Sequence, residues 1–213
     1  MEKAQLVEKI TNEVLKRIKA QSNVPSTVVG VSNRHMHVSK ADLECLFGKG
    51  YELTKWKNLK QPGQFAAKET VTIVGPKGAI EKVRILGPVR NRTQVEISKT
   101  DSFTLGIKAP IRESGNIKDT PGVMIKGPKQ SIRLHEGVII AKRHIHMSPS
   151  FAKQHGFHDK ELVKVQFNGE RGLVFNEVLL RVSEKFVNEM HIDTDEANAG
   201  NIGNGDVGII LKG

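Results

Sequence analysis

A segment near the start of the chain is repeated about half a chain later, and this repeat limits the folds that the chain can adopt. The first copy, Val31–Ser39, reads VSNRHMHVS, and the second copy, Ile140–Ser148, reads IAKRHIHMS. In each copy a short apolar run leads into Arg-His-x-His, and a serine that can cap a helix follows. Two copies of one supersecondary unit predict two similar domains within 213 residues.

Short β-branched runs separated by Gly and Pro fill the sequence after residue 26. Examples are Thr70–Val74, Lys82–Leu86, Gly137–Ile140 and Val178–Val182. Many short strands with turn residues between them are typical of all-β sandwiches and barrels. Helical patches are brief, and Ser39 and Ser148 are predicted to cap two of them. We therefore predict a mainly β fold of two pseudo-symmetric β-barrels capped by short helices, preceded by an N-terminal amphipathic helix.

Residues 1–22 are predicted to form that amphipathic helix, with a linker at Ser22–Ser26. Apolar side chains recur every four residues on one face of it. These side chains are Leu6, Ile10, Val14 and Ile18. Such a stripe fits a helix that packs on the body of the protein, and it fits equally a helix that docks another protein.

The charge of the chain limits its partners. It has 33 Lys and Arg against 23 Asp and Glu, a formal net charge of +10. This surplus suits either a nucleic-acid-binding protein or an enzyme for anionic substrates such as phosphates or coenzyme A. Aromatic residues make up 5% of the chain, which disfavours binding to single-stranded nucleic acid, because that binding relies on base stacking.

Cellular location is also constrained by the sequence. No apolar run approaches the roughly 18 residues of a membrane span, and the first residues do not resemble a secretory signal. Cys45 is the only cysteine, so an intramolecular disulfide is excluded and a cytoplasmic location is expected. We predict that Cys45 is a buried apolar residue of a short helix rather than a nucleophile.

Two His-x-His pairs stand at equivalent positions of the repeat: His35 with His37, and His144 with His146. Residues i and i+2 of a strand face the same side, so each pair offers two imidazoles to one point. One such pair is easily a chance occurrence, but two pairs at repeat positions favour a zinc site between the domains. Ligands without thiolate indicate catalytic rather than structural zinc.

His191 is a candidate third histidine ligand, since it lies among acidic residues. We expect Asp193 or Asp195 to accept the hydrogen bond from its second ring nitrogen. Arg90, Arg92 and Glu96 lie close together after Gly87-Pro88. Arginine forks suit bidentate phosphate binding, although a charged pair of this kind often only solvates a loop.

Several sequence motifs resemble those of the phosphate propanoyltransferases, the phosphotransacylases of propanediol utilisation. The motifs are Ser32–His37, Gln61–Ala66, Leu86–Arg90, Thr93–Ser98, Arg112–Gly115, Lys142–Met147 and Met190–Asn198. The resemblance covers roughly residues 24–211. It implies the reaction of a short-chain acyl-CoA, with propanoyl-CoA expected, and phosphate to give an acyl phosphate and CoA, in either direction.

The resemblance also implies a domain organisation. Residues 24–33 join 142–213 in one barrel, because the first strand is exchanged into it. Residues 34–141 form the other barrel, with a small two-stranded insert near 48–68. Two zinc ions per chain would lie between the barrels.

The roles of individual residues follow by resemblance alone. His35, His37 and Glu96 would hold one zinc ion, and His144, His146 and His191 the other. Arg90 matches the phosphate-binding arginine, which is also the implied catalytic residue. The positions matching the CoA site are Val31, Ser32, Asn33, Lys77, Arg84 and Asn198, with Lys57 and Leu86 as weaker candidates.

Two other functions remain as alternatives. A binuclear zinc hydrolase, either a thioesterase or a phosphatase, could use the same ligands on water. A basic nucleic-acid-binding barrel would explain the charge but would give the histidine pairs no role. For the preferred function we expect no nucleic acid or membrane partner, and homo-oligomerisation stays open. Residues 1–22 would be a targeting segment that binds shell or core proteins of a bacterial microcompartment.

Overall fold

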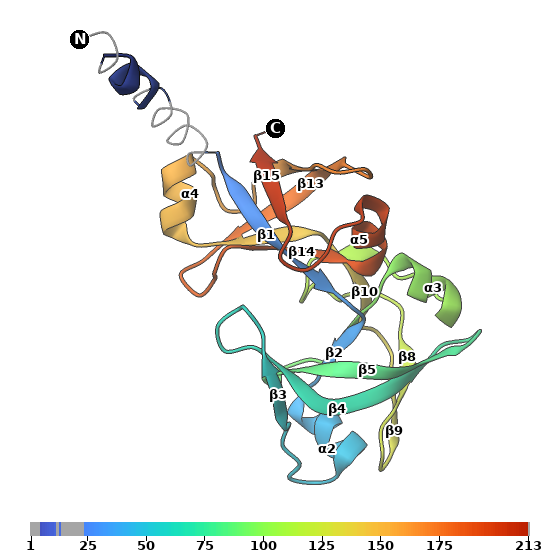
Figure 1. The fold of residues 1–213 in the computed structure, drawn as a ribbon. Coiled ribbons are helices and arrows are strands. Elements are labelled where there is room, and N and C mark those ends of the chain that lie inside the picture. The colour runs from blue at the N-terminus through green and yellow to red at the C-terminus, as the bar shows by residue number, and fades with distance from the viewer. Residues whose placement is uncertain (1–4, 12, 14–23, 213) are drawn as a thin grey trace.

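The computed structural model describes residues 5–11, 13 and 24–212, and within them the C-terminal strands close into a barrel. The barrel order is β1 (Ser26–Ser32), β14 (Glu189–Asp193), β11 (His144–Met147), β13 (Leu173–Val182), β12 (Leu162–Phe167) and β15 (Val207–Leu211). β1 runs parallel to β14 and antiparallel to β15, so it closes the ring (Figure 1). An N-terminal strand thus completes a barrel of C-terminal strands.

The remaining strands form a nine-stranded sheet that curls into a half-barrel. Its order is β7 (Ile111–Arg112), β10 (Val138–Ala141), β6 (Gln94–Glu96), β2 (His35–His37), β5 (Ala79–Gly87), β4 (Phe65–Val74), β8 (Val123–Lys126) and β9 (Ser131–Leu134). The ninth strand, β3 (Lys55–Asn58), pairs with β4. The predicted mainly β fold is confirmed, with one closed and one partly closed unit.

Four short helices cover the sheets: α2 (Lys40–Phe47), α3 (Lys99–Leu105), α4 (Pro149–His155) and α5 (Thr194–Gly200). Ser39 and Ser148 cap α2 and α4 as predicted, each accepting a backbone N–H of the first turn. α2 buries Leu43, Leu46 and Phe47 in the core of the half-barrel. The helix therefore fills the side that the open sheet leaves uncovered.

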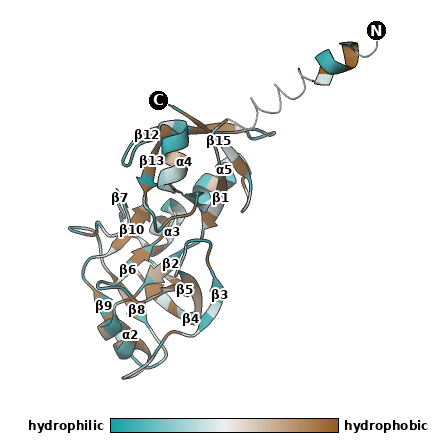
Figure 2. Cartoon of the chain, turned by 90° about the vertical axis from the view of Figure 1, so that its left-hand side faces the viewer, coloured by the Kyte–Doolittle hydropathy of each residue, from teal (hydrophilic) through white to brown (hydrophobic). Residues whose placement is uncertain are grey.

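Two apolar cores hold these elements together, one in each unit. The half-barrel core contains Met36, Ile73 and Ile85, and the barrel core contains Ile145 and Met190, all with no exposed surface. Figure 2 shows hydrophobic residues mainly along the strands of both units. Met36 and Ile145 are the middle residues of the two His-x-His pairs, so each pair is fixed by an inward-pointing neighbour.

Cys45 is exposed, so the prediction that it is buried was wrong. The apolar face of α2 consists of Leu43, Leu46 and Phe47, at the i, i+3, i+4 spacing of one helix face. Cys45 falls between these positions and so points to the other side of the helix.

Residues 5–11 are helical, as predicted for this part of the N-terminal segment, and they point away from the two units in Figure 1. Leu6 and Ile10 of the apolar stripe are more than half exposed. The other stripe residues and the linker lie largely outside the described residues. In the described part of the chain, no helix has the length and apolar character that a membrane crossing needs. The domain limits at 33/34 and 141/142 stay a prediction.

Candidate active site

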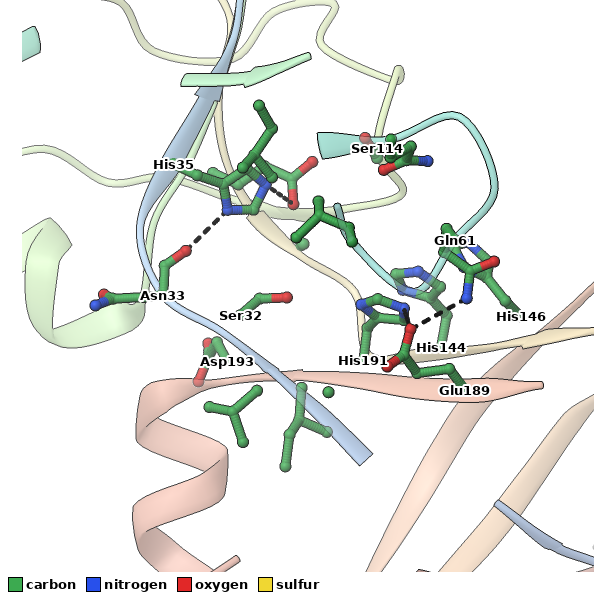
Figure 3. A pocket seen from close by; sticks show the side chains of 18 of the residues that line it. Ser32, Asn33, His35, Gln61, Ser114, His144, His146, Glu189, His191 and Asp193 are labelled. Carbon is green, nitrogen blue, oxygen red and sulfur yellow. Dashed lines mark hydrogen bonds and ion pairs between the residues drawn. The ribbon is translucent and has the colours of Figure 1, made fainter. Parts of the chain in front are cut away.

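A pocket of about 490 Å³ is lined by both units. The closed barrel contributes residues of β1, β11, β13 and β14, and the half-barrel contributes residues of β2, β5 and β6 together with the loops after β3 and β7. All six predicted zinc ligands and Arg90 line it. Figure 3 shows His35 on one side of the pocket and His144, His146 and His191 on the other.

His35, His37 and Glu96 form a compact, buried group whose ligand atoms lie within 4.8 Å of one another. β2 pairs with β6 so that His35 lies opposite Glu96, which explains how residues far apart in sequence meet. Nε2 of His35 lies 3.4 Å from one Glu96 oxygen, and Nε2 of His37 lies 3.7 Å from the other. Two imidazoles and a carboxylate are a donor set that zinc accepts.

His144, His146 and His191 form the second group, with ring centroids 4.8 to 5.2 Å apart. β11 pairs with β14 so that His144 lies opposite His191. Nδ1 of His146 makes no hydrogen bond with any described residue, and its ring stacks on Phe186 at 4.1 Å between centroids. A buried nitrogen without a partner costs free energy, and coordination to a metal would remove that cost.

The pKa values of these groups suit metal binding. Burial lowers the pKa of His37 to about 3, of His144 to about 4 and of His146 to about 2, and neighbouring histidines add to the shift. These imidazoles are therefore neutral at physiological pH, which is the form that coordinates metal. Burial opposes ionisation of Glu96, but the charges and hydrogen bonds of its neighbours, above all His35, hold its pKa well below the usual range.

His35 differs from His37, His144 and His146, because its pKa is raised rather than lowered. Burial alone would lower the pKa of His35, but the charge of Glu96 and its hydrogen bond outweigh burial and raise it. Nδ1–H of His35 donates to the carbonyl oxygen of Asn33 at 2.8 Å. Nε2 is then the nitrogen that faces Glu96 and is available for a metal.

Arg90 and Arg181 bring positive charge to both histidine groups. The Arg90 guanidinium donates to Ser114 Oγ at 3.3 Å, and Gln94 donates to the same oxygen and to Glu96. Burial lowers the pKa of Arg90, and the charge of Arg181 lowers it further against the opposing effect of Glu96. Arg181 lies opposite His146 in the β11–β13 pairing. Both arginines line the pocket.

A loop of the half-barrel is held against the closed barrel by Gln61. Its Nε2 donates to the backbone oxygen of Val187 and to Oε2 of Glu189, both at 3.1 Å, and its Oε1 accepts the Val187 N–H at 3.3 Å. The same Glu189 oxygen lies 3.1 Å from Nε2 of His191 (Figure 3). The loop therefore reaches the second histidine group through Glu189.

The carboxylate beside His191 is thus Glu189, and the expectation of Asp193 or Asp195 was wrong. Asp193 is instead the N-cap of α5 and accepts the N–H of Glu196. Asp195 accepts the backbone N–H of Thr100 at 2.7 Å. Asp193 therefore accepts a backbone N–H at the start of α5, and Asp195 accepts one at the start of α3. Carboxylates are favoured at both places.

The predicted CoA-site residues do not all lie at the pocket. Those that line it are Val31, Ser32, Asn33, Arg84 and Leu86, whereas Lys77, Asn198 and Lys57 are exposed and do not. Arg92, the other arginine of the predicted cluster, pairs with Glu136 on the surface. Pocket residues without a predicted role include Gln61, Ser114, Arg181, Phe186 and Glu189. Gln61 and Ser114 stand inside motifs noted in the sequence, as does Gln94, which donates to Ser114 Oγ.

Comparisons with known proteins identify the family of the chain. A family model described as phosphate propanoyltransferase matches residues 28–203. A Thermotoga maritima protein named phosphate propanoyltransferase is 59% identical over 189 residues, covering 88% of this chain and 90% of the relative. Proteins of the same name are 55% identical in Priestia megaterium, covering 97% and 95%, and 48% identical in Listeria monocytogenes, covering 98% and 96%. The chain therefore belongs to the phosphate propanoyltransferase family and is an acyltransferase.

Proposed function

We propose that this acyltransferase is zinc-dependent and interconverts propanoyl-CoA plus phosphate with propanoyl phosphate plus CoA. The observation that carries the proposal is the convergence of two histidine groups and two arginines on one pocket. A thioester, a phosphate and two metal ions would all need to meet at such a point. The relatives' name agrees with this substrate pair.

We propose two metal sites, and the ligand atoms of the first lie within 4.8 Å of one another. His35, His37 and Glu96 would hold the first, and His144, His146 and His191 the second. Buried neutral imidazoles, the ionised Glu96 and the unpartnered Nδ1 of His146 support this assignment. Bound zinc would supply Lewis acidity, which stabilises a leaving thiolate and a developing oxyanion.

Arg90 and Arg181 are proposed to bind phosphate between the two groups. Arginine side chains bind phosphate oxygens bidentately, and the positive guanidinium groups attract a doubly charged anion. Ser114 and Gln94 would hold Arg90 in place, since Ser114 Oγ accepts from both. A phosphate fixed beside the thioester carbonyl reacts far faster than one in solution.

The CoA arm is proposed to lie along β1 and β5. Val31, Ser32 and Asn33 of β1 and its end, and Arg84 of β5, line the pocket from opposite units. Lys77 and Asn198 are proposed to contact CoA outside the pocket. One methylene in the acyl chain changes binding only modestly, so acetyl- and butanoyl-CoA should also be used.

Residues 1–22 are proposed to target the enzyme, otherwise cytoplasmic, to a microcompartment that degrades propanediol. The exposed Leu6 and Ile10 support a docking role, because neither packs on the body of the protein.

A CoA-release assay with and without phosphate tests the proposal. CoA release from propanoyl-CoA should require phosphate, and zinc chelation should abolish it. Release of CoA at the same rate without phosphate would instead indicate a thioesterase.

A further inference from the structure

The pairing of β6 with β2 places two polar side chains of β6 beside the first His-x-His pair. The strands are antiparallel, with His35 opposite Glu96 and His37 opposite Gln94. Gln94 is buried, and its Nε2 donates to Oε1 of Glu96 at 2.6 Å. The proposed metal ligand of β6 is therefore hydrogen-bonded by the residue two positions before it, on the same face of the strand.

The closed barrel repeats this arrangement on β14. β11 and β14 are antiparallel, with His144 opposite His191 and His146 opposite Glu189. Since the two His-x-His pairs are equivalent in the sequence repeat, Glu189 takes the position in this unit that Gln94 takes in the other. Glu189 is also buried, and its Oε2 lies 3.1 Å from Nε2 of His191 (Figure 3). Each unit thus places a buried polar side chain against the ligand two residues further along the strand.

The two buried side chains differ, and each matches the ligand that it contacts. An ionised carboxylate such as Glu96 only accepts hydrogen bonds, and the amide of Gln94 donates to it. A metal-bound imidazole such as His191 keeps one ring N–H to donate, and Glu189 offers it an acceptor. Partners of this kind orient metal ligands and strengthen metal binding.

Gln94 and Glu189 are each held by a loop of the half-barrel. Oε1 of Gln94 accepts the backbone N–H of Gly115 at 2.7 Å, and Nε2 of Gln94 donates to Oγ of Ser114 at 2.9 Å. These bonds fix which end of the amide faces Glu96. Oε2 of Glu189 accepts from Nε2 of Gln61 at 3.1 Å. Both side chains are therefore held in place by contacts besides the one with the ligand.

The backbone of β1 leaves room for Glu189 at Gly30. Gly30 lies opposite His191 in the β1–β14 pairing. A Cβ atom at this position would lie 2.9 Å from Oε1 of Glu189 and 3.2 Å from its Cδ, which is closer than such atoms normally approach. Glycine is the residue that permits this close approach of a backbone. The carboxylate is thus enclosed by β1, β14 and the Gln61 loop.

We propose that Gln94 and Glu189 are equivalent positioning residues, one for each metal group. Gln94 orients Glu96 in the first group, and Glu189 orients His191 in the second. The inference rests on the proposed function, which supplies the two zinc ions. Since each residue acts on one group, its loss should weaken the binding of one ion and leave the other unchanged.

Variants that keep a single metal group separate the two roles. His35→Ala keeps the second group intact, and His144→Ala keeps the first. When Glu189→Ala is added to His35→Ala, zinc affinity measured by competition with a chelator should fall about 10- to 100-fold. When it is added to His144→Ala, zinc affinity should change less than about twofold. Gln94→Ala should give the reverse pattern in the two backgrounds.

Glu189→Gln in the His35→Ala background tests whether Glu189 positions the ligand or is itself a ligand. The amide keeps an acceptor oxygen and nearly the same volume, so it should recover most of the affinity that Glu189→Ala loses. Glu184→Ala is the matched control and should leave zinc affinity unchanged, since Glu184 is exposed in the loop before β14 and does not line the pocket. Thermal unfolding should show that every variant folds.

Equal zinc affinity with and without the Glu189 carboxylate in the His35→Ala background would overturn the inference. A loss in Glu189→Gln as large as that in Glu189→Ala would also overturn it, because a ligand carboxylate would behave in this way. The proposed function fails separately, if the wild-type protein binds no zinc.

Discussion

His35 and His144 orient their rings in the same way. In each, Nδ1–H donates to the carbonyl oxygen two residues earlier, Asn33 or Lys142, at 2.8 Å. The two histidines hold equivalent positions in the sequence repeat. A hydrogen bond of this kind fixes the tautomer and leaves Nε2 as the ligand nitrogen. Each half of the molecule therefore offers a histidine prepared in the same manner.

We expect His35→Ala and His144→Ala each to reduce the zinc content from two ions per chain to about one. The loss of one of three protein ligands breaks one site and leaves the other with its full set. Metal analysis of the purified variants measures this. His158→Ala, at an exposed position outside the pocket, should retain both ions. Two bound zinc ions in His144→Ala would contradict the assignment.

Arg90→Ala should lower kcat/KM for phosphate about 10- to 100-fold while KM for propanoyl-CoA stays nearly unchanged. Hydrogen bonds to charged groups contribute enough free energy for this change, and Arg90 is half-buried, where the charges of Glu96 and Arg181 affect its pKa. Initial rates at varied phosphate concentration measure the effect. Arg92→Ala is the control, because Arg92 pairs with Glu136 on the surface. Equal phosphate kinetics in the two variants would argue against the role of Arg90.

Gln61→Ala should reduce the free energy of unfolding by about 1–3 kcal/mol, since it leaves the buried Glu189 carboxylate and the Val187 backbone without these partners. Urea unfolding measures the change. Gln166→Ala is the control, because the hydrogen bond of Gln166 to Asn168 is exposed. It should reduce the free energy of unfolding by less than about 0.5 kcal/mol. Equal stability of the two variants would mean that the Gln61 bridge contributes nothing.

The metal-free protein should lose stability as the pH falls below about 6.5. Histidines of the unfolded chain titrate near 6.5, whereas burial lowers the pKa of His144 to about 4 and of His146 to about 2. The unfolded state therefore binds more protons in this range, so its population grows on acidification. Thermal unfolding of chelator-treated protein at pH 7.5 and pH 5 tests this. His146→Asn, which cannot titrate, should show a smaller decrease, and an equal decrease would refute this origin.

Deletion of residues 1–22 should abolish encapsulation in a microcompartment and leave the kinetics in solution unchanged. The barrel and half-barrel supply every residue that lines the pocket. Co-purification of the truncated protein with shell assemblies, compared with the full chain, measures encapsulation. Full encapsulation without residues 1–22 would show that targeting resides elsewhere in the chain.

The histidine pairs and the mainly β fold could be predicted from the sequence because their signals are local. A His-x-His pair on a strand faces one side whatever the tertiary structure, and Met36 and Ile145 between the pairs mark the buried side. The capping serines act within three residues of their partners. These features needed no knowledge of how the strands pair.

Gln61 and Arg181 carried no such signal. Gln61 meets Glu189 across 128 positions of sequence, and Arg181 meets His146 through the register of β11 and β13. Glu189 and Asp193 both lie two positions from His191 on β14, so strand alternation alone does not separate them. The carboxylate beside His191 was assigned to the wrong residue because Asp193 caps α5 instead.

Zinc-dependent acyl transfer to phosphate is measured by CoA release from propanoyl-CoA, recorded with and without phosphate, on protein whose zinc content is known. We expect two zinc ions per chain, CoA release that requires phosphate and yields propanoyl phosphate, and loss of that activity on chelation with recovery when zinc is restored. Phosphate-dependent release at full rate by protein free of zinc would contradict this expectation.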